Sequence, residues 1–453
     1  MRYFTFFIII IFWSCQPDII PDNIPDPVDT NSTPNYLVKN SDYIFDQNSL
    51  HTFELRLPDS SLAFLDSEPS AEIYTEGKLI FQGDTLNSVG IRYKGSNGAW
   101  WGCTSGNGPG FKTCTKLSMK VKINYKESSR KFYKLKKLQF HSMNHDPSQM
   151  HERLGYWLYR AAGIPAPRSV HARLVINDIY VGLFALTEQI DGQFAKYNFD
   201  DDGGNIYKEI WPLNSNGTPK STAEYINSLK TNEDENPSVQ TIKEFGQQIS
   251  NASSNQVIPI ISNHMDREEI ISYAVIDRLI RHDDGAFHWY CFGSDCAPHN
   301  FYWYEEPNNK KLHLIPWDLD LAFMNSITNE HTVTNLKDDW GQISNNCYPF
   351  QYGLLEQKSA ACDKLVSGWV SWGGPLYGQI ESQYENSLFS QAQVHSLINL
   401  WASQIRNATI EANNLHSMLY PSLIGNGAWK SSKTKLTTLE IIRESISYQF
   451  NLC

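Results

Sequence analysis

The chain has 453 residues, 41% of them hydrophobic, and a formal net charge of −11 at pH 7. The excess of acid argues against nucleic acid as the main partner, because phosphate backbones are bound by clustered cations. Behind the N-terminal segments about 400 residues remain, which exceeds a single small core and predicts one large domain or two lobes. The strongly basic stretch is residues 112–137, with ten Lys or Arg and one acid, Glu127.

The first fifteen residues predict export. Arg2 precedes an apolar run, 4–13, which is too short to span a bilayer and is typical of a secretory signal. Ser14 and Cys15 close this run and resemble a lipoprotein signal, in which the Cys becomes the lipidated first residue. An ordinary signal peptide with Cys15 incidental is the alternative. We expect residues 1–15 to be a lipoprotein signal peptide, with the mature protein held at the outer membrane, in the periplasm or at the cell surface through Cys15 alone.

Residues 16–45 are rich in Pro, Asp, Asn, Ser and Thr, which predicts an extended linker. Seven cysteines follow Cys15, and in an exported chain their proximity suggests three disulfides with Cys453 left over. A zinc site at Cys291 and Cys296 with His282 and His299 is the alternative for one pair. The expected disulfides are Cys103–Cys114, Cys291–Cys296 and Cys347–Cys362.

Strand patterns dominate from about residue 52 to residue 195. In the second of the four clearest strands, three lysines share one face, opposite three apolar residues. The predicted strands are Ile91–Lys94, Lys116–Ile123, Val170–Ile176 and Tyr180–Thr187, and the lysines are Lys116, Lys120 and Lys122.

A helix interrupts these strands. Asp146 is its expected N-cap, with Pro147 at the first helical position, and Gly163 followed by Pro165 supplies the stop. Its apolar stripe consists of Met150, Leu154, Trp157, Leu158 and Ala161.

Helical patterns dominate from about residue 220 onward, including Glu268–Ile280 and Gln391–Asn407, with a strand pair at Phe301–Tyr304 and Lys311–Ile315. A strand-rich half followed by a helix-rich half predicts an α+β fold of two lobes. The N-lobe would span residues 46–190, and the C-lobe with a C-terminal helical extension would span residues 191–453.

Two carboxylates follow the second strand of that pair. In the sequence IPWDLDLAF, Asp318 and Asp320 are two residues apart, so on an extended chain both would reach one hard cation. Mg²⁺ is usually held by one or two carboxylates together with substrate phosphates, which makes phosphoryl transfer the first chemistry to consider. A solvated strand end is the plain alternative.

Protein kinases use a strand lysine, a helix glutamate, a catalytic aspartate, an asparagine and a metal-binding aspartate. This chain offers those residue types in the same order along the sequence. The candidates are Lys94, Lys116 or Lys122 for the lysine, Glu152 for the glutamate, Asp283 or Asp284 for the base, and then Asn300 and Asp318.

Seven motifs in one order resemble the CotH-type proteins, which are regarded as atypical secreted protein kinases. They are RYKGSNG, KLSMKVKI, DPSQMHERLGYWLYRAAGIPAP, NDIYVGLFALTEQID, GGNIYK, the HDDG and HNFYWY pair, and IPWDLDLAF, and the resemblance covers about residues 52–325.

The resemblance implies a protein-kinase-like two-lobed fold that uses ATP with Mg²⁺ or Mn²⁺ to phosphorylate Ser or Thr of exported proteins. It also implies that Asp284 is the base, that Asn300 and Asp318 are the metal ligands with Asp320 in support, and that Glu188 lies on the adenine side.

Two questions stay open in the sequence. Among the lysines we favour Lys116 and then Lys122 for the phosphates, with Lys94 in RYKGSNG as the third candidate. The second question is activity, because a surface adhesin or scaffold that keeps the CotH fold without its chemistry is the alternative function. Between Asp284 and Asn300 the segment GAFHWYCFGSDCAPH is longer than the family pattern, and we expect a disulfide-pinned loop there.

Overall fold

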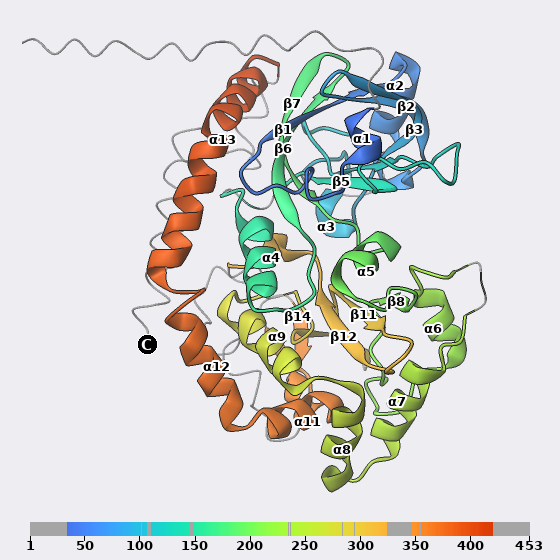
Figure 1. Ribbon diagram of the computed structural model, residues 1–453, viewed down its shortest axis with the longest axis vertical. Coiled ribbons are helices and arrows are strands. Elements are labelled where there is room, and N and C mark those ends of the chain that lie inside the picture. Colours follow the sequence, from blue (N-terminus) through green and yellow to red (C-terminus); the bar gives the residue numbers. More distant parts are fainter. Residues whose placement is uncertain are drawn as a thin grey trace, which may run out of the picture.

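The computed structural model describes residues 34–323 and 347–419. The positions left out inside these ranges are 101, 107–109, 145, 147, 234, 236, 283, 294 and 353–354. The described chain is a mixed α+β fold, as expected, with a β-barrel at one end and a mainly helical part at the other (Figure 1).

The barrel closes in the order β1-β2-β3-β4-β5-β7-β6. Neighbouring strands of the barrel pair antiparallel, except that β1 pairs with β6 in parallel and so closes the barrel. The strands are β1 (His51–Arg56), β2 (Thr75–Phe81), β3 (Asp84–Tyr93), β4 (Met119–Lys122), β5 (Lys137–His141), β6 (Ser169–Ile176) and β7 (Ile179–Thr187).

Alternation decides which side chains fill the barrel. In β4, Met119 and Val121 belong to the barrel core, whereas Lys120 and Lys122 are only half-buried on the other face, as predicted. Phe53, Phe81 and Phe140 come from three different strands, and the ring of Phe53 packs against the other two inside the barrel. The short elements beside the barrel are α1 (Asn35–Val38), α2 (Asp59–Ser67), η1 (Pro69–Ala71) and α3 (Asn97–Trp100).

Helix α4 (His151–Ala161) joins the barrel to the rest of the molecule. It starts later than predicted, because Gln149 has a left-handed backbone with φ 64°, which a helix cannot contain. Asp146 is therefore not the N-cap, although its carboxylate accepts a hydrogen bond from the N–H of His151 at 2.8 Å. Pro147 lies outside the described residues, and Gly163 ends the helix with φ 79°, as predicted.

The other part contains two small sheets and most of the helices. One sheet has the order β12-β11-β8 and the other β10-β9-β14-β13. The strands are β8 (Asn205–Lys208), β9 (Trp289–Phe292), β10 (Asp295–Pro298), β11 (Phe301–Glu305), β12 (Leu312–Pro316), β13 (Phe350–Tyr352) and β14 (Leu355–Lys358). The helices are α5 (Gly192–Asn198), α6 (Thr222–Ser228), α7 (Gln240–Asn251), α8 (Ser254–His264), α9 (Arg267–Leu279), η2 (Leu319–Leu321), η3 (Ala360–Cys362), α11 (Lys364–Gly373), α12 (Pro375–Glu385) and α13 (Gln391–Leu419).

Helix α13 ties the two parts together. It runs along one side of the molecule from α12 to the barrel (Figure 1), and it is longer than the predicted 391–407. At the barrel, Tyr180 donates to the carbonyl of Ala408 at 3.0 Å, and Arg173 pairs with Glu411 at 2.9 Å. These contacts hold the barrel against the helical part.

All three predicted disulfides are present, so the alternative zinc site at Cys291 and Cys296 is wrong.

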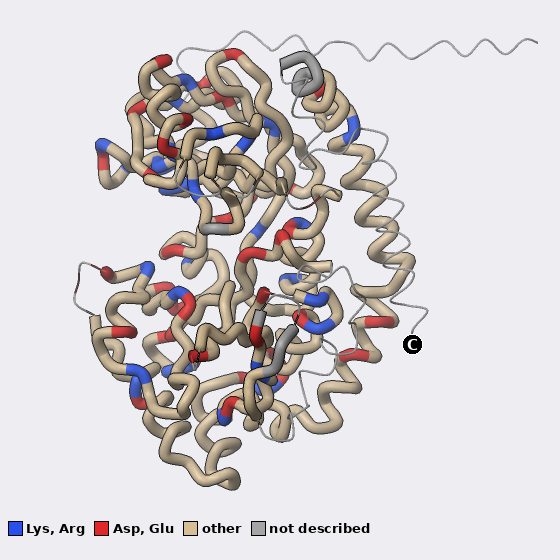
Figure 2. The backbone as a smooth tube through the Cα atoms, turned by 180° about the vertical axis from the view of Figure 1, so that it is seen from behind, with Lys and Arg blue, Asp and Glu red and all other residues tan. Residues whose placement is uncertain are grey.

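Figure 2 shows Lys and Arg interspersed with Asp and Glu over both parts. No helix within the described ranges is both long enough and apolar enough to cross a membrane.

Candidate functional site

The strand pair β11 and β12 brings Asn300 and Asp318 together. Phe301 pairs with Pro316, so the residue before β11 and the residues after β12 meet at one end of the sheet. The N–H of Trp317 donates to the carbonyl of Asn300 at 3.1 Å and fixes this meeting point. Asn300 and Asp318 both have φ 54°, a left-handed conformation that Asn and Asp adopt more readily than most residues.

Asp284 joins this pair from the loop after helix α9. Its Oδ2 accepts a hydrogen bond from Nδ2 of Asn300 at 2.7 Å. Burial, with the nearby negative charge of Asp318, raises the pKa of Asp284 to about 6, against the opposing effects of His282 and of the Asn300 hydrogen bond. A carboxyl group that titrates near neutrality is well suited to proton transfer.

Asp320 adds a further, half-buried carboxyl group close to Asp318 and Asp284. Burial raises its pKa well above the usual value, and the charges of Asp318, Glu152 and Asp284 act in the same direction. Its backbone carbonyl accepts a hydrogen bond from Nδ1 of His151 at 2.7 Å, which anchors η2 against α4. Carboxylates that repel one another in a buried place are stabilised by a cation.

A chain of polar groups reaches the carboxylates from the barrel. Nζ of Lys94 lies 2.8 Å from Nε2 of His141, and Nδ1 of the same ring lies 2.7 Å from Oε1 of Glu152. Thr187 donates to the other oxygen of Glu152 at 3.0 Å. Burial lowers the pKa of Lys94, while the negative charges of Asp318 and Glu152 oppose that shift. These residues therefore share one electrostatic environment with the carboxylate group.

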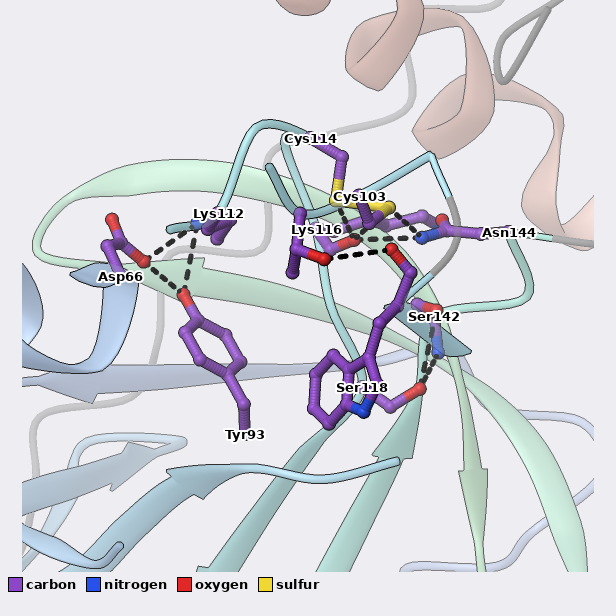
Figure 3. The surroundings of a disulfide bond; sticks show 11 residues. Asp66, Tyr93, Cys103, Lys112, Cys114, Lys116, Ser118, Ser142 and Asn144 are labelled. Carbon is purple, nitrogen blue, oxygen red and sulfur yellow. Dashed lines mark hydrogen bonds and ion pairs between the residues drawn. A yellow bond between two sulfur atoms is a disulfide. The ribbon is translucent and has the colours of Figure 1, made fainter. Parts of the chain in front are cut away.

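The loop that carries Lys94 is cross-linked. It connects β3 to β4, and the backbone N–H of Lys94 donates to the carbonyl of Ser118 at 2.8 Å. Cys103 and Cys114 form a disulfide within it, and Nδ2 of Asn144 lies 3.1 Å from Sγ of Cys103 (Figure 3). Lys94 thus starts from a loop that is tied to itself and to the segment after β5.

The two lysines favoured from the sequence lie elsewhere. Lys116 is buried, and its Nζ donates to the carbonyl of Leu183 in β7 at 2.6 Å. Nζ of Lys122 lies 5.9 Å from the centre of the Tyr74 ring. The structure therefore brings Lys94, and not these two, to the carboxylate group.

Glu188 is engaged by an arginine. It lies in the connection from β7 to α5, where its Oε2 accepts hydrogen bonds from the backbone N–H of Arg168 at 3.2 Å and from Nε of the same residue at 3.0 Å. Oε1 pairs with the same guanidinium group. Both side chains are buried, so this pair fixes the connection between the barrel and the helical part.

Sequence reasoning missed several residues here. His141 is one, because no motif marks it. Lys120 and Gln139 are cross-strand partners, so they share the outer face of the barrel with His141. Burial and the neighbouring positive charge of Lys137 lower the pKa of Lys120 to about 7, and within the described ranges Nε2 of buried Gln139 has no hydrogen-bond partner. The alternation of β5 was the available signal, but strand β5 itself was not predicted.

Glu209 is a further residue that sequence reasoning missed. It follows β8 with a left-handed backbone, φ 51°, and its Oε1 accepts a hydrogen bond from the backbone N–H of Asn300 at 3.2 Å. Its negative charge also contributes to the raised pKa of Asp284. The alternative base Asp283 lies outside the described residues.

The described residues contain no cluster of three or more His, Cys, Asp or Glu side chains that could hold a metal ion without other ligands. Zinc in proteins is held by such clusters, whereas Mg²⁺ needs only one or two carboxylates and takes its remaining ligands from water and substrate phosphates. The donor set of Asp318, Asp320 and the Asn300 amide matches the second pattern.

The family model described as CotH kinase protein matches residues 91–360. The chain belongs to this family. The matched region contains the carboxylates, Asn300, Lys94, His141 and Glu152, and it begins later and ends later than residues 52–325, over which the resemblance was expected. The search of curated proteins found no match. The CotH resemblance read from the motifs is therefore confirmed.

Proposed function

We propose that this protein is an exported protein kinase of the CotH type, which transfers the γ-phosphate of ATP to Ser or Thr of exported or surface proteins. One observation carries the proposal. Asp284 is hydrogen-bonded to Asn300 beside Asp318, and the chain from Lys94 to Glu152 approaches the same carboxylates from the barrel.

The order of elements supports a kinase-like two-lobed fold. Strands β3, β4 and β5 precede helix α4 with its glutamate, and β6 and β7 follow. After α9 come the aspartate, the asparagine and the second aspartate, in the order that kinase chemistry uses. We assign residues 46–190 to the N-lobe and residues 191–453 to the C-lobe with its helical extension.

The carboxylate group fits a divalent cation. Asn300 and Asp318 would hold Mg²⁺ or Mn²⁺, with Asp320 in support, because the negative charge of Asp318 contributes to the raised pKa values of Asp284 and Asp320 and a cation relieves that repulsion. When bound, the cation neutralises charge on the phosphates of ATP.

Asp284 is the proposed base. Its carboxylate accepts the proton of the substrate hydroxyl, and Nδ2 of Asn300 holds that carboxylate in place. A pKa of about 6 leaves most of the group deprotonated at pH 7 and still basic enough to take a proton in the transition state.

Lys94 is the proposed phosphate contact. His141 of strand β5 lies between the ammonium of Lys94 and the carboxylate of Glu152. The two charged groups are therefore connected through the imidazole ring rather than by a direct ion pair. With Glu152 accepting from Nδ1–H, Nε2 accepts from the ammonium of Lys94. Because Arg168 engages its carboxylate, we propose that Glu188 shapes the adenine side of the cleft through the backbone.

The test is phosphate transfer by the purified protein with labelled ATP, Mg²⁺ or Mn²⁺ and an acidic protein mixture. We expect label on the protein itself and on Ser or Thr of the mixture. Nucleotide binding without transfer under any metal would instead support the scaffold role and contradict the kinase.

The three disulfides are typical of a protein that matures outside the cytoplasm. Cys15 lies outside the described residues, and we propose that it carries a lipid anchor. Cys15→Ser should move the protein from the membrane fraction to the soluble fraction after cell lysis. Continued membrane association of this variant would contradict the anchor.

A further inference from the structure

The motif GGNIYK ends in Lys208, a lysine that has no part in the chemistry proposed above. It is the last residue of strand β8, and it lies directly opposite Tyr302 of β11. Cross-strand partners project from the same face of a sheet, so Lys208 and Tyr302 share one face. The side chain of Lys208 is 35% exposed, so its ammonium group is accessible to a ligand on that face.

This face of the sheet is turned toward the barrel half of the site. The ring centre of Tyr302 lies 5.6 Å from that of Trp317. Trp317 in turn lies under the barrel residues, because Nζ of Lys94 is 5.5 Å from its ring centre and the ring centre of His141 is 5.7 Å away. Lys208 and Lys94 therefore approach the same aromatic pair from opposite parts of the molecule.

The two lysines also affect each other electrostatically. Burial is the main cause of the lowered pKa of Lys94, and the positive charge of Lys208 acts in the same direction. Within the described ranges Lys208 forms an ion pair with Glu209, whose Oε2 lies 3.5 Å from Nζ, while Oε1 of Glu209 accepts from the N–H of Asn300. An anion between the two ammonium groups relieves their repulsion, and a phosphate group is such an anion.

The position of Lys208 relative to the proposed base indicates which phosphate it would meet. Its neighbour Glu209 is bonded to Asn300, whose side chain donates to Asp284 at 2.7 Å. Sites that transfer phosphoryl groups place Lys, Arg or metal ions where charge develops on the transferred group. Residues 285–299, between the base and Asn300, contain no Lys or Arg, so this part of the site draws no cation from that segment.

We propose that Lys208 is a catalytic residue that holds the γ-phosphate of ATP from the C-lobe side, opposite Lys94. The proposal rests on the kinase function proposed above. In the transfer, the acceptor hydroxyl oxygen bonds to the γ-phosphorus while the bond from that phosphorus to the β–γ bridging oxygen breaks. The hydroxyl proton goes to Asp284, and ADP leaves. Lys208 stays protonated and donates to a non-bridging oxygen of the γ-phosphate, where it stabilises negative charge.

The test compares Lys208 with a second lysine of the same kind. Lys208→Met removes the charge and keeps most of the stem, whereas Lys208→Arg keeps the charge. Lys220→Met is the matched control, because Lys220 is also partly exposed, at 23%, and pairs with a nearby acid, Glu224, at 3.2 Å. For each variant and the parent, kcat and KM for ATP are measured in the transfer assay. Thermal shifts are measured with ATP and with ADP, each with Mg²⁺.

We expect Lys208→Met to lower kcat by about 10²-fold and to change the KM for ATP by less than about threefold, because the contact matters most in the transition state. The additional stabilisation that ATP gives over ADP should disappear, with the ADP shift unchanged. Lys208→Arg should recover most of the transfer rate, and Lys220→Met should match the parent.

A parental kcat in Lys208→Met would overturn the assignment. Equal loss of the ATP and ADP shifts would also overturn it, because the contact would then not be to the γ-phosphate. Lys208→Gln repeats both measurements if the Met variant does not fold.

An indirect effect through Glu209 needs its own control, since Lys208→Met also removes the ion-pair partner of Glu209. Glu209→Gln removes the negative charge and keeps an acceptor for the N–H of Asn300. The double variant should transfer phosphate as slowly as Lys208→Met alone. Recovery of the double variant to the rate of Glu209→Gln would show that Lys208 serves only as the partner of Glu209, and would contradict the phosphate contact.

The thermal shifts separate this proposal from the kinase function. A difference between ATP and ADP that depends on Lys208, in a protein that never transfers phosphate, would support the γ-phosphate contact and contradict the kinase. Transfer that is unaffected by Lys208→Met would support the kinase and contradict the contact. A parent protein that is stabilised by neither nucleotide and transfers no phosphate would contradict both.

Discussion

The two halves of the candidate site are stabilised in opposite ways. The half from the helical part consists of carboxyl groups that repel one another, and the pKa values of Asp284 and Asp320 are raised. The half from the barrel is a connected chain in which His141 and Glu152 have hydrogen-bond partners. The first half should therefore destabilise the ligand-free fold, whereas the second should stabilise it, and substitutions can test this difference.

The largest expected effect is at Asp318. Asp318→Ala should lower phosphate transfer by at least about 10³-fold, because it removes a proposed metal ligand where charge develops. It should also abolish the thermal stabilisation that ATP and Mg²⁺ give to the parent, since only a ligand that binds the native state stabilises it. The exposed Glu233→Ala is the control. An undiminished thermal shift in Asp318→Ala would refute the metal assignment.

Asp284→Asn should lower transfer by about 10²- to 10⁴-fold and leave nucleotide affinity nearly unchanged, because a base acts mostly in the transition state. Asp363→Asn is a matched control, since burial also raises the pKa of Asp363 to about 6 and this residue caps helix α11 far along the chain. Asp283→Asn tests the neighbouring residue. Loss of transfer in Asp283→Asn alone would reassign the base.

Lys94→Met should lower transfer by about 10²-fold and raise the KM for ATP, because it removes the proposed phosphate contact. Lys116→Met is the comparison, and it should lower thermal stability through the lost bond to the Leu183 carbonyl while its transfer rate stays parental. If Lys116→Met lost phosphate transfer and Lys94→Met kept it, Lys116 would be the phosphate contact, as the sequence favoured.

Glu152→Gln tests the half of the site that comes from the barrel, which we expect to stabilise the fold. It removes the charge shared by His141 and Thr187, so we expect about 1–3 kcal/mol less stability to urea and roughly tenfold slower transfer. Glu188→Gln loosens another buried carboxylate pair and should lose stability but keep the transfer rate. Equal loss of transfer in both variants would show that Glu152 has no special link to the site.

The smallest effect is a pH dependence of stability. Because the pKa of Asp284 is raised in the folded state, the folded protein binds more protons than the unfolded protein between pH 4 and 6. The contribution of Asp284 to the free energy of unfolding is therefore present at low pH and is lost as pH rises through about 6. Asp284→Asn should therefore be more stable than the parent by about 2 kcal/mol at pH 7 and equally stable near pH 4. Urea melts at both values measure this, and a variant less stable at pH 7 would contradict it.

Local patterns marked the positions of the carboxylate half, while their proposed roles came from the CotH resemblance. Asp284, Asn300 and Asp318 each stand at the end of a helix or strand whose periodicity is visible in the sequence, and strands β11 and β12 lie close to their predicted positions. Cysteine spacing likewise predicted all three disulfides, because each pair closes a short loop.

The tertiary structure alone decided the other half. Lys94, Lys116 and Lys122 carry the same charge and lie in or beside predicted strands, and only the pairing of β3, β4, β5 and β7 places Lys94 beside His141 and Lys116 beside the Leu183 carbonyl. The barrel itself depends on β1 pairing with β6, more than a hundred residues along the chain. Sequence periodicity records which face of a strand is buried, but it does not record which distant strand lies beside it, because that choice depends on packing of the whole core.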